Sequence, residues 1–305
     1  MIDFRYHVVS IVAVFIALAV GIVLGSGPLK DDISGFLEDR TEQLAQEKVD
    51  LQSELSAVRQ DLAYNEQIAE VSQPVLLDQL LAGHVTTVVV LPDTDTDRVK
   101  AVESAIEIAG GSLGERVTLE PSWTDPDQID VLSEVASAAA RGNRGDDAYT
   151  LASQVLADAL LTPGGRGVGE PADDPGATVV SFEAAGFITA DEGEIIKADT
   201  AVVVGPSGEF AGAEAVVVPL VAALDENGLG TVLTAPVGSD GPDGVVGVVR
   251  ESDADGVVST EDRLETVTGV TVTVGALAEQ LAGGIGHYGT GEGSDAAAPD
   301  PWPRG

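Results

Sequence analysis

The feature that most constrains this sequence is an uninterrupted apolar segment close to its start. Residues 8–24 read VVSIVAVFIALAVGIVL, and Ser10 carries the only polar side chain among them. A helix rises about 1.5 Å per residue, so this run spans ~25 Å, and residues 25–29 extend it past the ~30 Å of a bilayer interior. Leu, Ile, Phe and Val all favour membrane insertion. The segment therefore predicts a transmembrane anchor over residues 8–29.

Two alternatives to an uncleaved anchor stay open at this point. Gly25, Ser26 and Gly27 are small residues of the kind found at signal-peptide cleavage sites, although the run is longer than the usual h-region of about 7–15 residues. A buried core helix fits less well, because the run lacks a polar face. Arg5 precedes the run, so the positive-inside tendency predicts a cytoplasmic segment 1–7 and an extracytoplasmic remainder. We expect a single-pass protein of the plasma membrane.

The charge balance of the chain excludes some classes of partner. There are 15 Lys and Arg residues against 51 Asp and Glu, which gives a formal net charge of -36. Nucleic acid is not expected as a partner, because binding its backbone requires Lys and Arg to replace counterions. Electrostatic adhesion to anionic lipid headgroups is excluded for the same reason. The chain contains no Cys, so it forms neither a disulfide framework nor a thiolate metal site.

A heptad pattern begins directly after the anchor. Heptad position d is occupied by Leu37, Leu44, Leu51 and Val58, which recur every seven residues. Heptad position a is occupied by Leu55 and Leu62, and also by Lys48. No Pro or Gly interrupts residues 37–73, so the pattern predicts a coiled coil over residues 30–73. An amphipathic helix lying on its own globular domain is the open alternative. In the coiled-coil interpretation, self-association, with a homodimer expected, uses Leu37, Leu44, Leu51, Leu55, Val58 and Leu62.

Residues 74–288 alternate short Val-rich runs with helical patterns. Predicted strands lie at 85–91, 117–119, 201–204, 230–233 and 245–249. Predicted helices lie at about 99–108, 129–140, 149–160, 216–227 and 274–281. Unbroken apolar strands between helices are typical of a mainly parallel sheet covered on both faces. We expect a Rossmann-like or flavodoxin-like α/β domain that begins after Pro74. The Gly- and Pro-rich residues 289–305 are expected to form a disordered tail.

Candidate chemistry is sparse. Asp93, Asp95 and Asp97 repeat the opening of an EF-hand loop, but Arg98 replaces its Gly and Ser104 its Glu, so capping of the next helix competes with metal binding. The three histidines are far apart, and no nucleophile–base set can be assembled, so no enzyme is expected. Copper prefers thiolate, thioether and imidazole ligands. With no Cys, one Met and three His, no cofactor is predicted, and copper is expected only as cargo.

Three segments together resemble one actinobacterial family. They are the opening MIDFRYHVVSIVAVFIALAVGIVLGSGPL, the coiled coil that follows it, and VVSTEDRLETVTGVTVTVGALAEQLAGGIGHYG near the C-terminus. The sequence is similar there to the mycobacterial copper transport protein B (MctB) family, also described as SteB. The resemblance implies copper efflux and resistance, with a pore in the outer, mycolate membrane.

The SteB description implies a different role. It is that of a non-catalytic scaffold that binds a SteA-like protein across the membrane and controls a peptidoglycan hydrolase during cell division. A single helix cannot enclose a channel, so a pore would require several chains. The sequence thus leaves two hypotheses: a transport protein and a structural regulator of the envelope.

Overall fold

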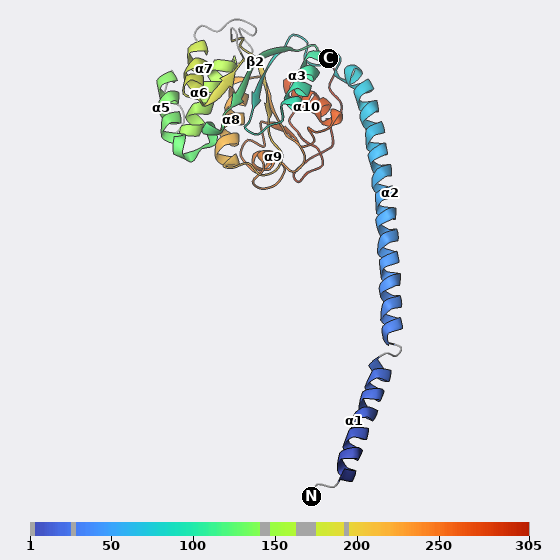
Figure 1. The fold of residues 1–305 in the computed structure, drawn as a ribbon. Helices are drawn as coiled ribbons and strands as arrows, with labels where there is room; N and C mark the ends of the chain where they lie inside the picture. Colours follow the sequence, from blue (N-terminus) through green and yellow to red (C-terminus); the bar gives the residue numbers. More distant parts are fainter. Residues whose placement is uncertain (1–3, 26–28, 141–146, 163–174, 192–194, 305) are drawn as a thin grey trace. The chain divides into compact units, whose positions relative to one another are not determined.

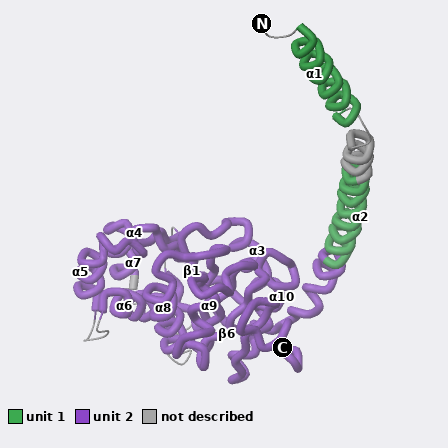
Figure 2. The backbone as a smooth tube through the Cα atoms, turned by 90° about the horizontal axis from the view of Figure 1, so that it is seen from below, with its two compact units in different colours: residues 1–65 green, residues 66–305 purple. Residues whose placement is uncertain are grey.

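The computed structural model describes residues 4–25, 29–140, 147–162, 175–191 and 195–304, with side chains left undescribed at 29–39 and 175. The chain divides into two compact units, residues 1–65 and 66–305, which are coloured separately in Figure 2. The first unit is entirely helical within its described part. The second contains all the strands.

Helix α1 (Phe4–Gly25) occupies the predicted anchor. Its 22 residues span ~33 Å, and none of them is buried. Within the described residues it is the one helix long and apolar enough to cross a membrane. Membrane anchors and N-terminal signal sequences share these properties. The predicted helix is therefore confirmed, whereas its retention in the mature protein as an uncleaved membrane anchor stays a prediction.

Helix α2 (Leu29–Leu77) contains the whole heptad region. Its 49 residues form one continuous helix, ~74 Å long, as the coiled-coil pattern predicts. The sequence suggests that Pro74 ends this helix, yet α2 continues for almost another turn. A proline costs one backbone hydrogen bond. Within the second unit, burial of Leu77 and a hydrogen bond from Gln73 Nε2 to Thr271 Oγ1 (3.0 Å) stabilise the last turn.

The second unit is built on a seven-stranded sheet in the order β3-β2-β1-β4-β5-β6-β7. All neighbouring pairs are parallel except β2 and β3, which are antiparallel. The strand order reverses between β1 and β4, as in doubly wound folds. The strands are β1 (Val85–Val90), β2 (Ser112–Leu119), β3 (Ile188–Ala190), β4 (Thr200–Val204), β5 (Thr231–Thr234), β6 (Ser259–Glu261) and β7 (His287–Tyr288).

Helices cover both faces of this sheet, which confirms the predicted α/β class (Figure 1). Successive strand residues point to opposite faces, so Val89 joins one hydrophobic core while Val88 and Val90 join the other. The first core packs against α5 (Ile129–Ala139), α6 (Ala148–Leu160), α7 (Pro175–Ala184), α8 (Ala213–Asn227) and α9 (Val245–Arg250). The second packs against α3 (Thr96–Ile108) and α10 (Val267–Leu281). Trp123, in the short α4 (Pro121–Thr124), is fully buried beside Phe182 and Phe187.

The predicted strand at 245–249 is wrong, because these residues form α9. Four valines in six residues favour a strand by propensity. Hydrogen bonds to the preceding loop override that preference: the Ser239 carbonyl accepts from the backbone N–H groups of Val246 (2.9 Å) and Gly247 (3.0 Å). Residues 259–261, for which no strand was predicted, supply the next strand of the sheet.

The predicted disordered tail is also wrong for residues 289–304. Ala296 pairs with Tyr288 at the edge of the sheet, and the Trp302 indole packs against the second core. The indole Nε1 donates to the carbonyl oxygen of Leu76 (3.0 Å). Gly275 makes this packing feasible, since a Cβ at that position would collide with the Trp302 ring. Contacts with residues distant in sequence, rather than its own composition, order this segment.

Candidate functional site

The first candidate site is the apolar stripe on α2. Its members Leu44, Leu51, Leu55, Val58 and Leu62 are between 49% and 58% exposed. Leu44, Leu51 and Leu55 line a shallow groove together with Lys48. A sustained row of half-exposed leucines is the surface that a partner helix covers in a coiled coil. The sixth predicted residue, Leu37, falls outside the part of the chain whose side chains are described, and self-association itself stays a prediction.

The Asp93–Asp97 loop lies where ligands bind in doubly wound folds, after β1 at the reversal of strand order. Asp95 is the N-cap of α3: its Oδ1 accepts from the backbone N–H of Asp97 (2.9 Å). The Asp97 carboxylate is exposed and pairs with Lys100 at 3.5 Å. Asp93 adopts a left-handed backbone conformation (φ 62°). The helix-capping interpretation is confirmed, and no cluster of three or more metal-ligating side chains is found among the described residues.

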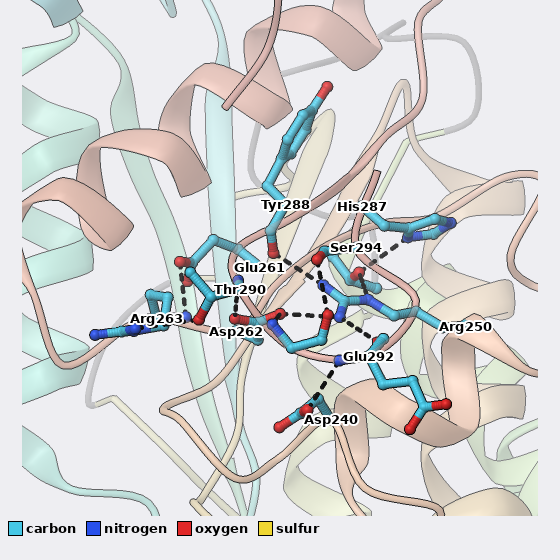
Figure 3. Close-up of polar contacts among 12 residues, drawn as sticks. Asp240, Arg250, Glu261, Asp262, Arg263, His287, Tyr288, Thr290, Glu292 and Ser294 are labelled. Carbon is cyan, nitrogen blue, oxygen red and sulfur yellow. Dashed lines mark hydrogen bonds and ion pairs between the residues drawn. The ribbon is translucent and has the colours of Figure 1, made fainter. Parts of the chain in front are cut away.

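A cluster of buried polar side chains lies at the C-terminal end of β6 (Figure 3). Arg250 and Asp262 form an ion pair at 2.9 Å, with side chains only 3% and 2% exposed. The guanidinium also donates to Thr260 Oγ1 (2.9 Å) and to the carbonyl oxygens of Tyr288 (2.8 Å) and Glu292 (2.9 Å). A buried charge requires such complete pairing, because desolvation alone costs several kcal/mol.

Asp262 completes this network from the opposite side. Its two oxygens accept the backbone N–H groups of Thr290 (2.9 Å) and Gly291 (3.1 Å), and Asp240 Oδ2 accepts that of Glu292 (3.0 Å). Gly289 has φ +128°, and a Cβ there would collide with the Asp262 carboxylate, so this close approach requires glycine. The network fixes the backbone that follows β7.

Two further titratable groups adjoin the ion pair. Burial raises the pKa of Glu261 to about 8, well above the ordinary value of a carboxyl group. Its oxygens lie 2.9 Å from Thr234 Oγ1 and 2.7 Å from the backbone N–H of Arg263. His287 is held between Thr260 Oγ1 (2.9 Å) and Asp255 Oδ1 (2.8 Å). Each of these two groups is thus held by its own partners, on the strands that carry the ion pair and the start of the C-terminal segment.

Sequence reasoning by side-chain chemistry missed this cluster. A signal was present in the C-terminal motif, because Thr260, Asp262, Tyr288 and Gly289 all belong to it. The structure shows that these positions build the network described above, and that the Tyr288 hydroxyl donates to Glu279. The motif thus encodes the packing of the last strands against the C-terminal segment.

Comparison with known proteins covers nearly the whole chain. Residues 1–299 match the protein-family model described as "Copper transport outer membrane protein, MctB". The "Copper transporter MctB" of Mycobacterium tuberculosis is 29% identical over 310 residues, which covers 96% of this chain and 98% of that protein. The protein of the same name from Mycobacterium leprae is 31% identical over 319 residues, with the same coverage.

Proposed function

Because this chain belongs to the MctB copper transport family, we propose that it is a membrane-tethered envelope protein that supports copper efflux and copper resistance. The observation that carries this proposal is the family match along both units, from α1 to the C-terminal segment. The relatives' printed name, copper transporter, supplies the cargo. Copper is transported or handled as cargo here, with no resident cofactor and no catalysed reaction.

The chain contributes a tether rather than a complete channel. In this proposal α1 stays in the plasma membrane, with residues 1–7 inside the cell and the α/β domain outside. One helix encloses no aqueous path, since only bundles of helices or closed barrels line a pore in lipid. Export through the membrane therefore requires several copies of α1 or another protein, and α2 supplies a means of gathering them.

A second function, as an envelope scaffold, is favoured by the exposed leucine stripe on α2. A single helix whose apolar a and d residues are half-exposed buries them by pairing with another helix. Here two copies pair through α2, and the assembly binds a SteA-like protein and controls a peptidoglycan hydrolase during cell division. This candidate needs no pore and no copper ligand.

Deleting the gene in its native host separates the two functions. The deletion strain is expected to grow less well than wild type at raised copper and to accumulate severalfold more copper, measured by elemental analysis of washed cells. Full-length protein restores both properties. A matched variant in which a cleaved signal peptide replaces residues 1–29 does not, because it lacks the tether.

Two outcomes decide between the candidates. Unchanged copper tolerance together with chained, undivided cells would contradict the copper proposal and support the scaffold. Copper sensitivity with normal division would do the reverse. Growth at raised zinc serves as the control for general weakness of the envelope.

A further inference from the structure

The end of α2, residues 66–77, belongs to the second unit (Figure 2). Within this segment only Leu77 is buried, and Val71 and Val75 are 77% and 79% exposed. Pro74 also removes one backbone hydrogen bond from the helix here. Side-chain contacts, rather than burial in the core, therefore hold most of the segment on the α/β domain.

Two hydrogen bonds join this segment to α10. Glu66 Oε2 accepts from the backbone N–H of Val267 (3.1 Å), one of the N–H groups at the start of α10 that have no partner within the helix. Gln73 Nε2 donates to Thr271 Oγ1 (3.0 Å), which lies one turn further along α10. A single hydrogen bond shifts an equilibrium by only about two- to tenfold, so these two bonds leave the docking reversible.

The C-terminal residues 289–304, called the strap below, add a third bond. The indole Nε1 of Trp302 donates to the carbonyl oxygen of Leu76 (3.0 Å), one of the last carbonyls of α2, which have no partner within the helix. The same indole ring lies against Gly275 of α10 and is partly buried at the second core. Trp302 thus contacts α2 and α10 together and holds one on the other.

The docked segment also continues the heptad frame of α2. Counting on from Leu62 at position a, Ala69 falls at a and Ser72 at d, and both are partly buried. Glu66 and Gln73, whose side chains bond to α10, fall at e, which borders the seam of a coiled coil. A partner helix along this part of the seam and α10 therefore compete for the same side of α2.

We propose that the strap keeps the α2 coiled coil short, and that releasing it lets a second copy pair along α2 as far as Leu76. With Trp302 in place, α10 covers one side of the segment, and pairing ends near Leu62. Without Trp302, only the bonds of Glu66 and Gln73 hold the segment, and the partner helix displaces α10. This two-length pairing rests on the self-association through α2 proposed above.

Single cysteines in the full-length protein, which has no native Cys, test the two lengths. Two copies tethered by α1 in one membrane run parallel, so equal d positions meet, and L51C and S72C both place a thiol at d. Oxidation with diamide in native membranes is expected to link L51C strongly and S72C weakly. Adding W302A to S72C is expected to raise the disulfide-linked fraction about fivefold or more on non-reducing gels.

Two further substitutions separate the strap from general loosening of the domain. T271V removes the acceptor of Gln73 without altering α2, and it is expected to raise linkage through S72C about twofold or more. R304A changes an exposed residue of the strap, and it is expected to leave that linkage unchanged. Linkage through L51C is expected to stay the same in every background.

Equal linkage through S72C in the wild-type, W302A and T271V backgrounds would overturn the proposal. A rise at L51C that parallels the rise at S72C would do so too, because it reports tighter association rather than a longer coil. Absence of linkage at L51C refutes pairing through α2 altogether, whereas strong linkage at L51C with an unchanged S72C refutes the strap alone. Copper tolerance of the deletion strain is a separate measurement, and circular dichroism confirms that each variant is folded.

Discussion

Replacing Arg250 by alanine is expected to lower the free energy of unfolding of the α/β domain by about 3–5 kcal/mol. The substitution leaves the Asp262 carboxylate, 2% exposed, without its cation at 2.9 Å. It also removes the donor to the carbonyl oxygens of Tyr288 and Glu292, which position the segment after β7. Urea unfolding of the full-length protein in detergent, followed by the fluorescence of Trp123 and Trp302, measures the change.

A matched substitution controls for the loss of one arginine. Arg304 is exposed near the C-terminus, so R304A is expected to change the free energy of unfolding by less than about 0.5 kcal/mol. D262N, which keeps the size of the side chain but removes its charge, should also destabilise strongly because Arg250 then lacks a counter-ion. A cost below about 1 kcal/mol for R250A would contradict a stabilising role for the buried pair.

Replacing Leu55 by aspartate is expected to dissociate the self-associated protein. Leu55 lies at an a position in the stronger half of the heptad region, and burying one leucine contributes about 1.5–3 kcal/mol. A dimer buries two such residues, so the substitution should weaken the dissociation constant about a hundredfold or more. Sedimentation velocity of full-length protein in detergent measures the change as a shift to the monomer.

The control for L55D keeps the helix and the added charge. Ser53 lies at the f position, on the side of the helix away from the stripe, so S53D is expected to sediment like wild type. An unchanged sedimentation coefficient for L55D, or an equal shift for S53D, would count against an interface along the stripe. If L55D is monomeric and still restores copper tolerance, self-association is dispensable for that function.

The elements that follow from local pattern were predictable. The β-branched run at 85–91 becomes β1 and the run at 201–204 becomes most of β4, because central parallel strands are buried on both faces. The uncharged run became α1, and the heptads became α2. Asp95 caps α3 because its side chain reaches a backbone N–H two residues ahead. Each of these features depends on residues close together in sequence.

The features that were not predicted depend on contacts with residues outside the segment itself. Residues 245–250 are helical because the loop ending at Gly244 supplies acceptors to the first turn. Residues 289–304 are ordered because Arg250 and Asp262 bond to their backbone and Trp302 packs on the second core, and Arg250 is 42 positions away from its acceptor Glu292. Composition carries no record of such pairings. The motif that resembled the family contains Thr260, Asp262, Tyr288 and Gly289 of the network, but the sequence alone does not show that they lie together.

The most direct test of a single-span tether with its α/β domain outside the cell is labelling of single cysteines. The chain has no native Cys, so each introduced thiol reports one position. Tyr6 on α1 and Asp253 in the second unit are both exposed. In intact cells, a membrane-impermeant maleimide is expected to label D253C at full length in the membrane fraction, and Y6C only after lysis. Labelling of Y6C but not D253C, or release of D253C as a shortened soluble chain, would contradict the tether.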